Sequence, residues 1–360
     1  MKFSIAANMQ RVSPDESIED VAQAGLDLVK LADEGGFEIA WAAEHHCLEM
    51  IIAPNPFVLL THWAAHTKRI RLGTAVVVAP YWHPIRVAGE AGFTDLFTGG
   101  RLEIGIARGA FQYEFDRMAA GIPQQQGGEY VKEMVPVLKG LWQGDYEHDG
   151  KYWRFPKATA VPKPLQQPHP PLWVAARGPD TFQWAVEHGL NIMSTPLQKP
   201  FGEVKDLADK LQVAVDQSSG GTRPRWLVLR NTCVYQNPDD WRVPVDAAMH
   251  FSAQFQGLFT TGGTVTNGFP QEISLQGGQR PQDYTPEALW ENMVFGTPEQ
   301  VVEKLKQYRA LGVDLYCYGA NFGLPHSFAR RSLELFIDEV MPHFAGESMA
   351  LTDQDIMSEA

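Results

Sequence analysis

Three consecutive polar residues, Glu44-His45-His46, end an apolar run that predicts a strand over residues 37–45. An imidazole titrates near neutral pH, so a histidine at the end of a strand can exchange a proton with a ligand. Side chains alternate between the two faces of a strand, and we therefore expect that these three residues do not all share one site. The triplet supplies at least one candidate for acid–base chemistry.

Two arginines also end predicted strands, Arg108 at the end of 101–108 and Arg177 at the end of 171–177. Guanidinium groups bind anions as bidentate partners, and a strand end followed by a helix start offers free backbone N–H groups. These features favour a phosphate-bearing ligand at the turn formed by Arg177, Gly178, Pro179, Asp180 and Thr181. The alternative is that both arginines form ion pairs at the rim and that Asp180 only caps the helix.

Metal and thiol chemistry have little support in the sequence. No HxH or HExxH pattern is present, and the helical pair His62 and His66 lacks an obvious third ligand, so we expect no metal site. The three cysteines, Cys47, Cys233 and Cys317, form no CxxC pair and no disulfide framework. Cys47 has no visible activating partner. This cysteine usage fits a reducing cytosol, and we expect a cytoplasmic protein.

The elements that must position these residues alternate between strands and helices. Strands are predicted over residues 2–8, 37–45, 70–78, 101–108, 171–177, 190–195, 226–235 and 313–318. Helices are predicted between them, over 17–35, 55–68, 84–97, 180–188, 201–216, 245–258, 297–311 and 327–344. Two longer excursions interrupt the pattern: 113–162, with two helical patterns and a hairpin turning at 148–150, and the glycine-rich stretch 260–284, which we expect to be a mobile loop.

Eight apolar strands alternating with helices favour a closed (β/α)8 TIM barrel over an open sheet, with insertions after strands 4 and 7. The turn after the first strand lacks the glycine-rich phosphate-binding patterns GxGxxG and GxxxxGK[ST], which an open nucleotide-binding sheet would need. Active sites of such barrels lie at the carboxyl ends of the strands, where the candidates above are found. We expect a single barrel domain over 1–346 and a frayed tail over 347–360.

Composition narrows the classes of partner. The 360 residues are 44% apolar and carry a net charge of −13, which should repel nucleic-acid backbones and anionic membrane surfaces. No stretch approaches the ~20 apolar residues that a membrane span requires, and the N-terminus has no secretory pattern. Ala88, Gly89, Ala91 and Gly92 form a smooth helix face that suits either a homodimer or an intramolecular contact.

Several segments resemble the bacterial luciferase-like flavin-dependent monooxygenases: AAEHHCLEM, GGRLEIGIARGAFQYEF, PLWVAARGPDTFQWAVEHGL and FGTPEQVVEKLKQYRALGVD. Their order and spacing match over most of the chain. The resemblance implies a barrel enzyme that binds reduced FMN (FMNH2) delivered by a separate flavin reductase. It further implies that O2 reacts to give a flavin peroxide, which transfers one oxygen atom to a small organic substrate. We expect the substrate pocket to be apolar.

Site residues follow from the resemblance position by position. His45 matches the catalytic histidine of the EHH motif, and Ala75 and Val76 match a pair joined by a cis peptide bond beneath the flavin ring. Arg108 matches the arginine near the flavin phosphate, and the turn from Gly178 to Thr181 matches the phosphate-binding turn. Luciferase itself has a reactive cysteine where this chain has Ala107, and it has an acidic residue followed by serine at Arg177-Gly178. Light emission and thiol chemistry are therefore not implied.

Three other functions stay open. A deazaflavin-dependent hydride-transfer oxidoreductase shares the barrel and needs no oxygen. A noncatalytic flavin-binding protein would leave His45 idle. A phosphate-binding aldolase or isomerase would need a lysine at a strand end, and none of the eight predicted ends supplies one. A mobile loop over 260–284 suits an oxygenase, because a lid keeps water from a reactive intermediate.

Overall fold

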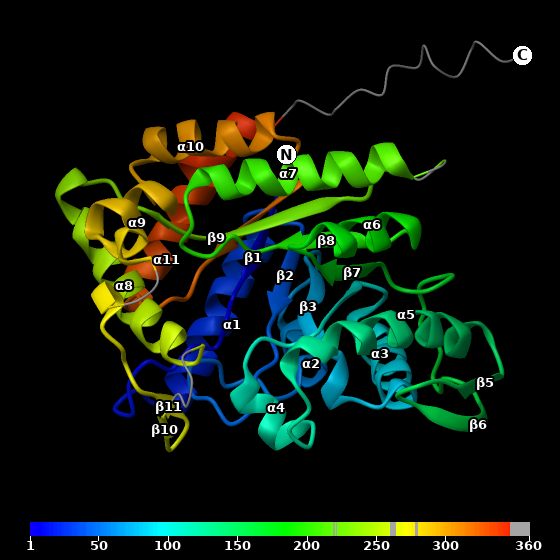
Figure 1. The fold of residues 1–360 in the computed structure, drawn as a ribbon. Helices are drawn as coiled ribbons and strands as arrows, with labels where there is room; N and C mark the ends of the chain where they lie inside the picture. The colour runs from blue at the N-terminus through cyan, green and yellow to red at the C-terminus, as the bar shows by residue number, and fades with distance from the viewer. Residues whose placement is uncertain (219, 221, 260–263, 278–279, 346–360) are drawn as a thin grey trace, which may run out of the picture.

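Eight parallel strands close into a barrel in the computed structural model, which describes residues 1–218, 220, 222–259, 264–277 and 280–345. The barrel strands are β1 (Lys2–Ala6), β2 (Ile39–Ala42), β3 (Arg71–Val78), β4 (Leu102–Ala107), β7 (Leu172–Ala175), β8 (Asn191–Ser194), β9 (Trp226–Val234) and β13 (Leu315–Gly319). Each strand pairs with the next in this order, and β13 pairs with β1 to close the ring, with Lys2 opposite Leu315. The predicted (β/α)8 barrel is confirmed (Figure 1).

Helices outside the barrel connect its strands. They are α1 (Ile18–Glu34), α2 (Pro56–His66), α3 (Pro84–Thr98), α6 (Pro179–Glu187), α7 (Phe201–Gln217), α10 (Pro298–Ala310) and α11 (His326–Leu335). Their starts carry the expected signals: Ser17 caps α1 by accepting the Asp20 N–H at 3.3 Å, and Thr297 with Gln300 forms a capping box on α10. Four of these seven helices begin with proline, which supplies the helical φ where no N–H partner is needed.

Both predicted insertions are present. The insertion after β4 contains α4 (Gln112–Met118), α5 (Gly127–Gln143), β5 (Tyr146–Asp149) and β6 (Arg154–Ala158). The insertion after β9 contains α8 (Arg242–Gly257), β10 (Val265–Thr266), β11 (Phe269–Pro270), α9 (Pro286–Asn292) and β12 (Val294–Gly296). Figure 1 shows the β5–β6 and β10–β11 hairpins at opposite edges of the view. The loop after β2, the start of α4 and the end of α8 pack together through Leu48, Phe111 and Leu258.

Large side chains fill the barrel interior. The Trp41 and Trp173 rings meet edge to face with their centroids 5.4 Å apart, and both side chains are almost fully buried. Gly73 of β3 makes room for the indole, because a Cβ atom at this position would lie 2.2 Å from two Trp41 ring carbons. The interior is therefore a packed core, and a ligand site has to lie at an end of the barrel.

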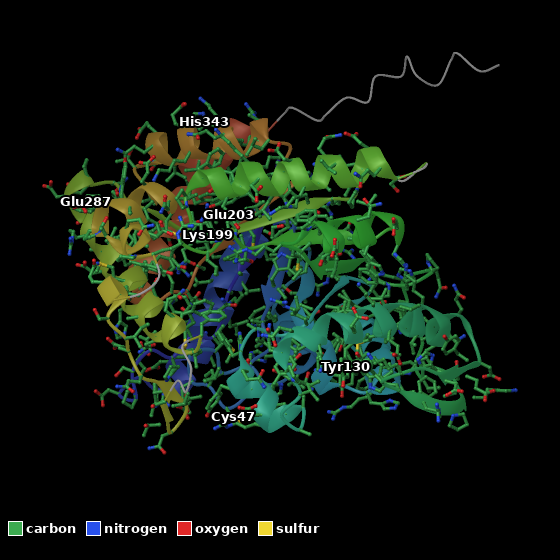
Figure 2. All side chains as sticks on the ribbon, viewed as in Figure 1. Cys47, Tyr130, Lys199, Glu203, Glu287 and His343 are labelled. Atoms are coloured by element: carbon green, nitrogen blue, oxygen red, sulfur yellow. The ribbon has the colours of Figure 1, made fainter. Side chains whose placement is uncertain are left out.

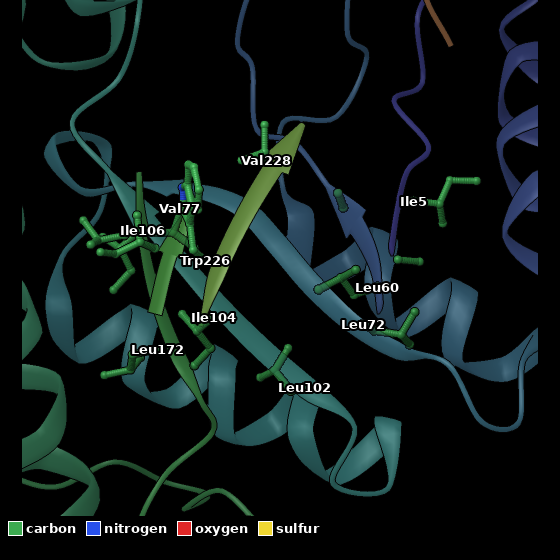
Figure 3. Packing of buried hydrophobic residues seen from close by; sticks show 14 of the residues in the cluster. Ile5, Leu60, Leu72, Val77, Leu102, Ile104, Ile106, Leu172, Trp226 and Val228 are labelled. Carbon is green, nitrogen blue, oxygen red and sulfur yellow. The ribbon is translucent and has the colours of Figure 1, made fainter. Parts of the chain in front are cut away.

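The outer face of the barrel packs against the helices. Ile104 and Ile106 of β4, Leu172 of β7 and Val228 of β9 belong to this outer core (Figure 3). Because both faces of the sheet are covered, the strands are continuous apolar runs rather than alternating ones. This explains why periodicity located the strands well but indicated little about which side chains face inward.

The structure differs from the predicted elements in several places. Strand β2 ends at Ala42 and not at residue 45. The segment 260–284 includes β10, β11 and short 3-10 turns, although 260–263 and 278–279 lie outside the described residues, as does the tail expected over 347–360. Helix α9 and strand β12 were not predicted, because they are only seven and three residues long. Within the part of the chain that is described, no helix is long and apolar enough to cross a membrane.

Candidate active site

A cavity of about 190 Å³ lies at the carboxyl ends of the barrel strands. Its wall comes from the segments that follow β1, β2 and β8, from β3 and β9, and from α8. It includes Asn8, His45, Ala75, Thr195, Arg230 and Phe255. A wider surface hollow of about 480 Å³, between Trp241 and Trp290, contains none of the predicted site residues. The barrel mouth is therefore the candidate active site.

His45 is held at this cavity by a carboxylate from the first insertion. Its Nδ1 lies 3.2 Å and 3.3 Å from the two carboxylate oxygens of Glu114, which is 1% exposed. The same carboxylate accepts the backbone N–H of His46 at 2.6 Å. These contacts fix the plane of the His45 ring. Its Nε2 has no hydrogen-bond partner among the described residues and is the nitrogen available to a ligand.

Glu44 anchors the other side of this segment. It is 2% exposed and accepts the Val78 N–H at 2.9 Å and the Trp82 indole N–H at 2.9 Å. Its carboxylate also lies 2.7 Å from Nε2 of His46. Glu44 thus ties the loop after β2 to the end of β3, since a buried carboxylate needs several donors to offset its loss of solvation.

Only His45 of the triplet lines the cavity, as expected, but strand alternation is not the reason. Strict alternation applies to a strand, and β2 ends two residues before Glu44. Beyond that point the chain turns, with Cys47 in the left-handed region at φ 58. Glu44, His45 and His46 therefore enter one hydrogen-bonded network with Glu114, although only His45 of these lines the cavity.

Two opposing effects set the pKa of His45. Burial is the larger single effect and lowers the pKa, because it disfavours the charged ring. The Glu114 charge, the Glu114 hydrogen bond and the Glu44 charge together outweigh burial, so the pKa of His45 is raised above its ordinary value. The imidazolium is stabilised at this position, and His45 can hold a proton close to a ligand near neutral pH.

The Ala75–Val76 pair lies on β3 beside the cavity. The peptide bond between these residues is cis, and Ala75 forms part of the cavity wall. The preceding residue, Thr74, is tied to β4 by two hydrogen bonds with Gly105, at 2.8 Å and 2.9 Å. The structure thus brings His45 and Ala75 to the same cavity.

Arg108 and Arg177 follow neighbouring strands, because β4 and β7 pair with Ile106 opposite Val174. Neither forms part of the cavity wall, and both are exposed. Arg177 makes the ion pair that was weighed as an alternative, with its Nη2 2.8 Å from Glu203. Glu203 and the neighbouring Lys199 are labelled in Figure 2. Arg108 makes no ion pair with any residue that the structure describes. The two arginines therefore differ in how available they are to an anion.

Glu203 is shared by two cations at the start of α7. Its carboxylate lies 2.8 Å from Arg177 and 3.3 Å from Lys199. Partial burial raises the pKa of Glu203. The interactions with Arg177 and Lys199 lower this pKa by a larger amount, so it lies below its ordinary value. An anion bound by Arg177 would have to compete with this carboxylate.

The turn after Arg177 is open to an anion. Gly178 caps α6, and no side chain satisfies the first N–H groups of this nine-residue helix. Space around Gly178 is open, since a Cβ atom built there would meet nothing within 4 Å. Pro179 and Asp180 are exposed, and Thr181 is partly exposed. The helix N-terminus fits a phosphate, with the Asp180 carboxylate as an opposing charge.

Two site residues were missed in the sequence. Glu114 lies in a short helix whose pattern indicated only an excursion of the chain. Arg230 lies in the middle of β9 and is 1% exposed, and it lines the cavity. A charged residue inside the apolar strand WLVLRNTCV indicates a buried polar site. The prediction covered only residues at the ends of strands and so did not include Arg230.

Known proteins resemble this chain along most of its length. A family model described as "Luciferase-like monooxygenase" matches residues 1–315. The oxygenase component of the flavin-dependent trigonelline monooxygenase of Acinetobacter baylyi is 40% identical over 345 residues, covering 96% of both chains.

Solved structures show the same fold at lower identity. Monooxygenase RslO1 from Streptomyces bottropensis gives a TM-score of 0.82 at 24% identity, covering 96% of this chain and 100% of that one. The oxygenating constituent of 3,6-diketocamphane monooxygenase from Pseudomonas putida, in complex with FMN, gives 0.76 at 19%, covering 95% and 98%. The coenzyme F420 dependent tetrahydromethanopterin reductase of Methanopyrus kandleri gives 0.73 at 21%, covering 95% and 99%. These likenesses establish the barrel alone, because the same fold serves both kinds of cofactor.

Proposed function

Because the chain belongs to the luciferase-like monooxygenase family, we propose that it is the oxygenase component of a two-component flavin-dependent monooxygenase. In this proposal a separate reductase supplies reduced FMN, and O2 is the oxidant. The observation that carries it is the placement of His45, paired with a buried carboxylate, in a cavity at the catalytic end of a barrel that is 40% identical to such a component. Trigonelline, which that relative is named for, is the first substrate to test.

The residues present fit reduced FMN. We infer that Arg108 and the open N-terminus of α6 hold the phosphate and that the ring lies over Ala75, beside His45. When bound, reduced FMN supplies the two electrons that oxygen activation requires, so that one oxygen atom enters the substrate and the other leaves as water. The small Ala75 side chain leaves room for a flat ring.

His45 is the proton-handling group in this proposal. Glu114 holds Nδ1, which leaves Nε2 directed to the ligand side of the ring. With its pKa raised, the imidazolium can donate a proton to an oxygen atom and recover it later. Glu114 is a positioning residue, because it contacts His45 and not the cavity.

A homodimer fits an exposed apolar face on the outside of the barrel. Helices α2 and α3 pack against each other and together expose four large apolar side chains. These are Val58 of α2 and Phe93, Leu96 and Phe97 of α3, which are 46–66% exposed. The rings of Phe93 and Phe97 meet edge to face at 4.7 Å and present one aromatic surface. Large exposed apolar groups in a cluster favour a protein contact, and we propose a second copy of the chain as the partner.

The small-residue face of α3 has a different role. The Ala88 carbonyl accepts the Trp142 indole N–H at 3.0 Å, and a Cβ atom on Gly92 would lie 2.1 Å from the Pro162 carbonyl oxygen. Of the two possibilities left open in the sequence, this face makes the intramolecular contact. It lets the segment after the β5–β6 hairpin pass close to α3.

One experiment separates this function from hydride transfer. The protein is mixed with trigonelline and photoreduced FMN, with and without O2, and in parallel with reduced F420 under anaerobic conditions. We expect turnover only with reduced FMN and O2, with one 18O atom in the product when the gas is 18O2. Anaerobic turnover with reduced F420 would refute the proposal. Tight FMN binding without turnover of trigonelline or of other small heteroaromatic compounds would favour a binding protein instead.

A further inference from the structure

The surface hollow of about 480 Å³ lies outside the barrel mouth and shares no residue with the active-site cavity. Its walls come from the segment between β9 and α8, from α9 and from the first turn of α10. The residues that line it are Tyr235, Pro238, Trp241, Glu287, Trp290, Glu291 and Gln300. An occupant of this hollow would therefore not compete with the flavin ring. Glu287, at its rim, is labelled at the edge of the molecule in Figure 2.

The floor of the hollow is aromatic. Tyr235 is 3% exposed, and Trp241 and Trp290 are partly exposed. The Trp290 indole N–H donates to the Tyr235 hydroxyl at 2.8 Å, which fixes these two rings relative to each other. Single apolar side chains are common on protein surfaces, whereas large aromatic groups gathered in one hollow are typical of a binding site.

Both indole rings already hold a cation of this chain. The Lys304 Nζ lies 4.1 Å from the centre of the Trp290 ring. The guanidinium carbon of Arg242 lies 5.3 Å from the centre of the Trp241 ring. Both cations are engaged elsewhere, since Lys304 donates to three backbone carbonyls and Arg242 pairs with Asp246 at 2.7 Å. Neither of them lines the hollow, so the rings are open to a further cation from that side.

Unpaired carboxylates surround this aromatic floor. Glu287 and Glu291 lie one helical turn apart on α9, and both are exposed at the rim. Neither forms an ion pair with any residue that the structure describes. Asp239 and Asp240 lie between two residues of the wall and also have no ion-pair partner in the described chain. Four negative charges beside aromatic rings favour a cationic occupant.

The openness of the hollow favours a side chain of another protein over a small molecule. The rim residues Pro238, Glu287, Glu291 and Gln300 are exposed, and only the floor is buried. Sites for small ligands enclose about 70–90% of the ligand surface. A side chain that belongs to a partner protein is covered on its outer side by the partner itself. Arginine, tryptophan and tyrosine are also the residues most enriched at the energetic centres of protein interfaces.

We propose that this hollow is a docking site for an arginine side chain of a partner protein. The planar guanidinium can stack on an indole ring and pair with a carboxylate of Glu287 or Glu291 through two parallel hydrogen bonds. A lysine ammonium is a strongly hydrated point charge and suits the flat rings less well. The remaining carboxylates favour further basic residues in the same segment of the partner.

The docking site and the active site share one element. Trp290 of α9 lines the hollow, and Met293, directly after this helix, lines the active-site cavity. The Asn292 side chain donates to the Gln198 carbonyl at 2.9 Å, which fixes the end of α9 to the loop after β8. A partner bound in the hollow therefore contacts the segment that borders the active site.

The test is calorimetric titration of the full chain, at low salt, with the blocked tripeptides acetyl-Gly-Arg-Gly-amide and acetyl-Gly-citrulline-Gly-amide. Citrulline has the shape of arginine without its charge. We expect the arginine peptide to bind about 10-fold more tightly, the combined effect of an exposed cation–π contact and an exposed ion pair. Combining Glu287→Gln with Glu291→Gln should remove most of this preference, and Trp241→Leu should reduce it.

The matched control combines Asp145→Asn with Glu147→Gln. These two acids are exposed near the β5–β6 hairpin, lie outside the hollow and form no ion pair with a described residue. The control changes the net charge by the same amount as the Glu287 and Glu291 double variant, and it should behave as wild type. A control that loses the preference equally would show that the peptide responds to overall charge, and the proposal would be wrong.

The other outcomes also decide the proposal. Equal binding of the two peptides by wild type, or a preference that survives the loss of both Glu287 and Glu291 charges, would overturn it. If methylguanidinium binds as tightly as the arginine peptide, the hollow is a site for small cations and not for a protein. If acetyl-Gly-Lys-Gly-amide binds as tightly, the assignment to arginine is wrong. None of these titrations requires flavin or oxygen, so they test the docking site independently of the proposed function.

Discussion

Glu114 and His45 lie 69 residues apart in sequence and 3.2 Å apart in space, between the carboxylate and Nδ1. The contact joins the first insertion to the loop after β2, because the same carboxylate also accepts the His46 N–H. A helix that is not part of the barrel repeat therefore determines the orientation of the candidate proton donor.

Replacing Glu114 by Gln should lower turnover more than it lowers flavin affinity. The amide keeps the shape of the side chain but removes the charge that stabilises the imidazolium, so the pKa of His45 falls. We expect turnover at neutral pH to fall about 10-fold, the factor that one charge-assisted hydrogen bond contributes. The imidazolium form of His45 should also be lost at a lower pH than in wild type. A pH profile of turnover measures both. Glu90→Gln, at a partly exposed position of α3, is the control; a profile for Glu114→Gln that matches wild type would contradict the assigned role.

The same pair predicts how stability depends on pH. The pKa of His45 is raised in the folded state, so its contribution to stability is complete below its ordinary value of 6.5 and is lost as pH rises through the folded-state pKa. Wild type should therefore lose more unfolding free energy than Glu114→Gln as the pH rises above 6.5. Urea unfolding of both proteins at several pH values gives this difference, and the other histidines cancel in it. Parallel curves would show that the pair does not titrate.

The sequence predicted the features that depend on neighbouring residues, but not the contacts between segments that are far apart in the chain. The barrel followed from periodicity, and His45, which lines the cavity, was a candidate because of its place close to a strand end. Glu114 could not be assigned, because the turn that brings α4 over the loop after β2 depends on packing among Leu48, Phe111 and Leu258.

Arg230 and Arg177 show two different limits of sequence reasoning. The orphaned Nη2 of Arg230 depends on β8 ending where β12 has not begun, and β12 is too short to give a signal. Arg177 forms its ion pair with Glu203, which lies 26 residues later in the sequence. The positions of charged residues along the sequence did not identify this partner.

Two glycine substitutions, one inside the barrel and one on an outer helix, should change the free energy of unfolding in opposite directions. Gly73→Ala places a Cβ atom 2.2 Å from the Trp41 ring, which is fully enclosed, and should lower the free energy of unfolding by about 1–3 kcal/mol. Gly202→Ala, in the first turn of α7 with nothing within 4 Å, should raise it by up to about 1 kcal/mol. Urea unfolding tests both. An unchanged midpoint for Gly73→Ala would mean that Trp41 can move aside.

The α2–α3 face predicts the oligomeric state. If a second copy covers Phe93 and Phe97, changing Phe97 to Lys buries a charge in the contact and should convert the dimer to a monomer. Light scattering after size exclusion measures the mass. Val213→Lys, equally exposed on α7, is the control and should leave the dimer intact. A wild-type protein that is already monomeric at micromolar concentration would contradict the proposed homodimer.

Arg108 and Arg177 should contribute unequally to flavin binding, although both end neighbouring strands. Arg108 has no ion-pair partner in the described chain, so its guanidinium is free to bind the phosphate, whereas Arg177 would first have to leave Glu203. Arg108→Ala should weaken FMN binding about 10- to 100-fold, the range for hydrogen bonds to charged groups, and Arg177→Ala should weaken it less.

Riboflavin provides the control for this comparison, because it lacks the phosphate and its affinity should be the same in both variants and in wild type. Fluorescence titration of the two flavins gives all six constants. If Arg108→Ala weakens riboflavin and FMN equally, Arg108 contacts the ring or supports the fold, and the phosphate site lies elsewhere. If Arg177→Ala has the larger effect on FMN alone, the Glu203 pair opens on binding, and Arg177 is the main phosphate ligand.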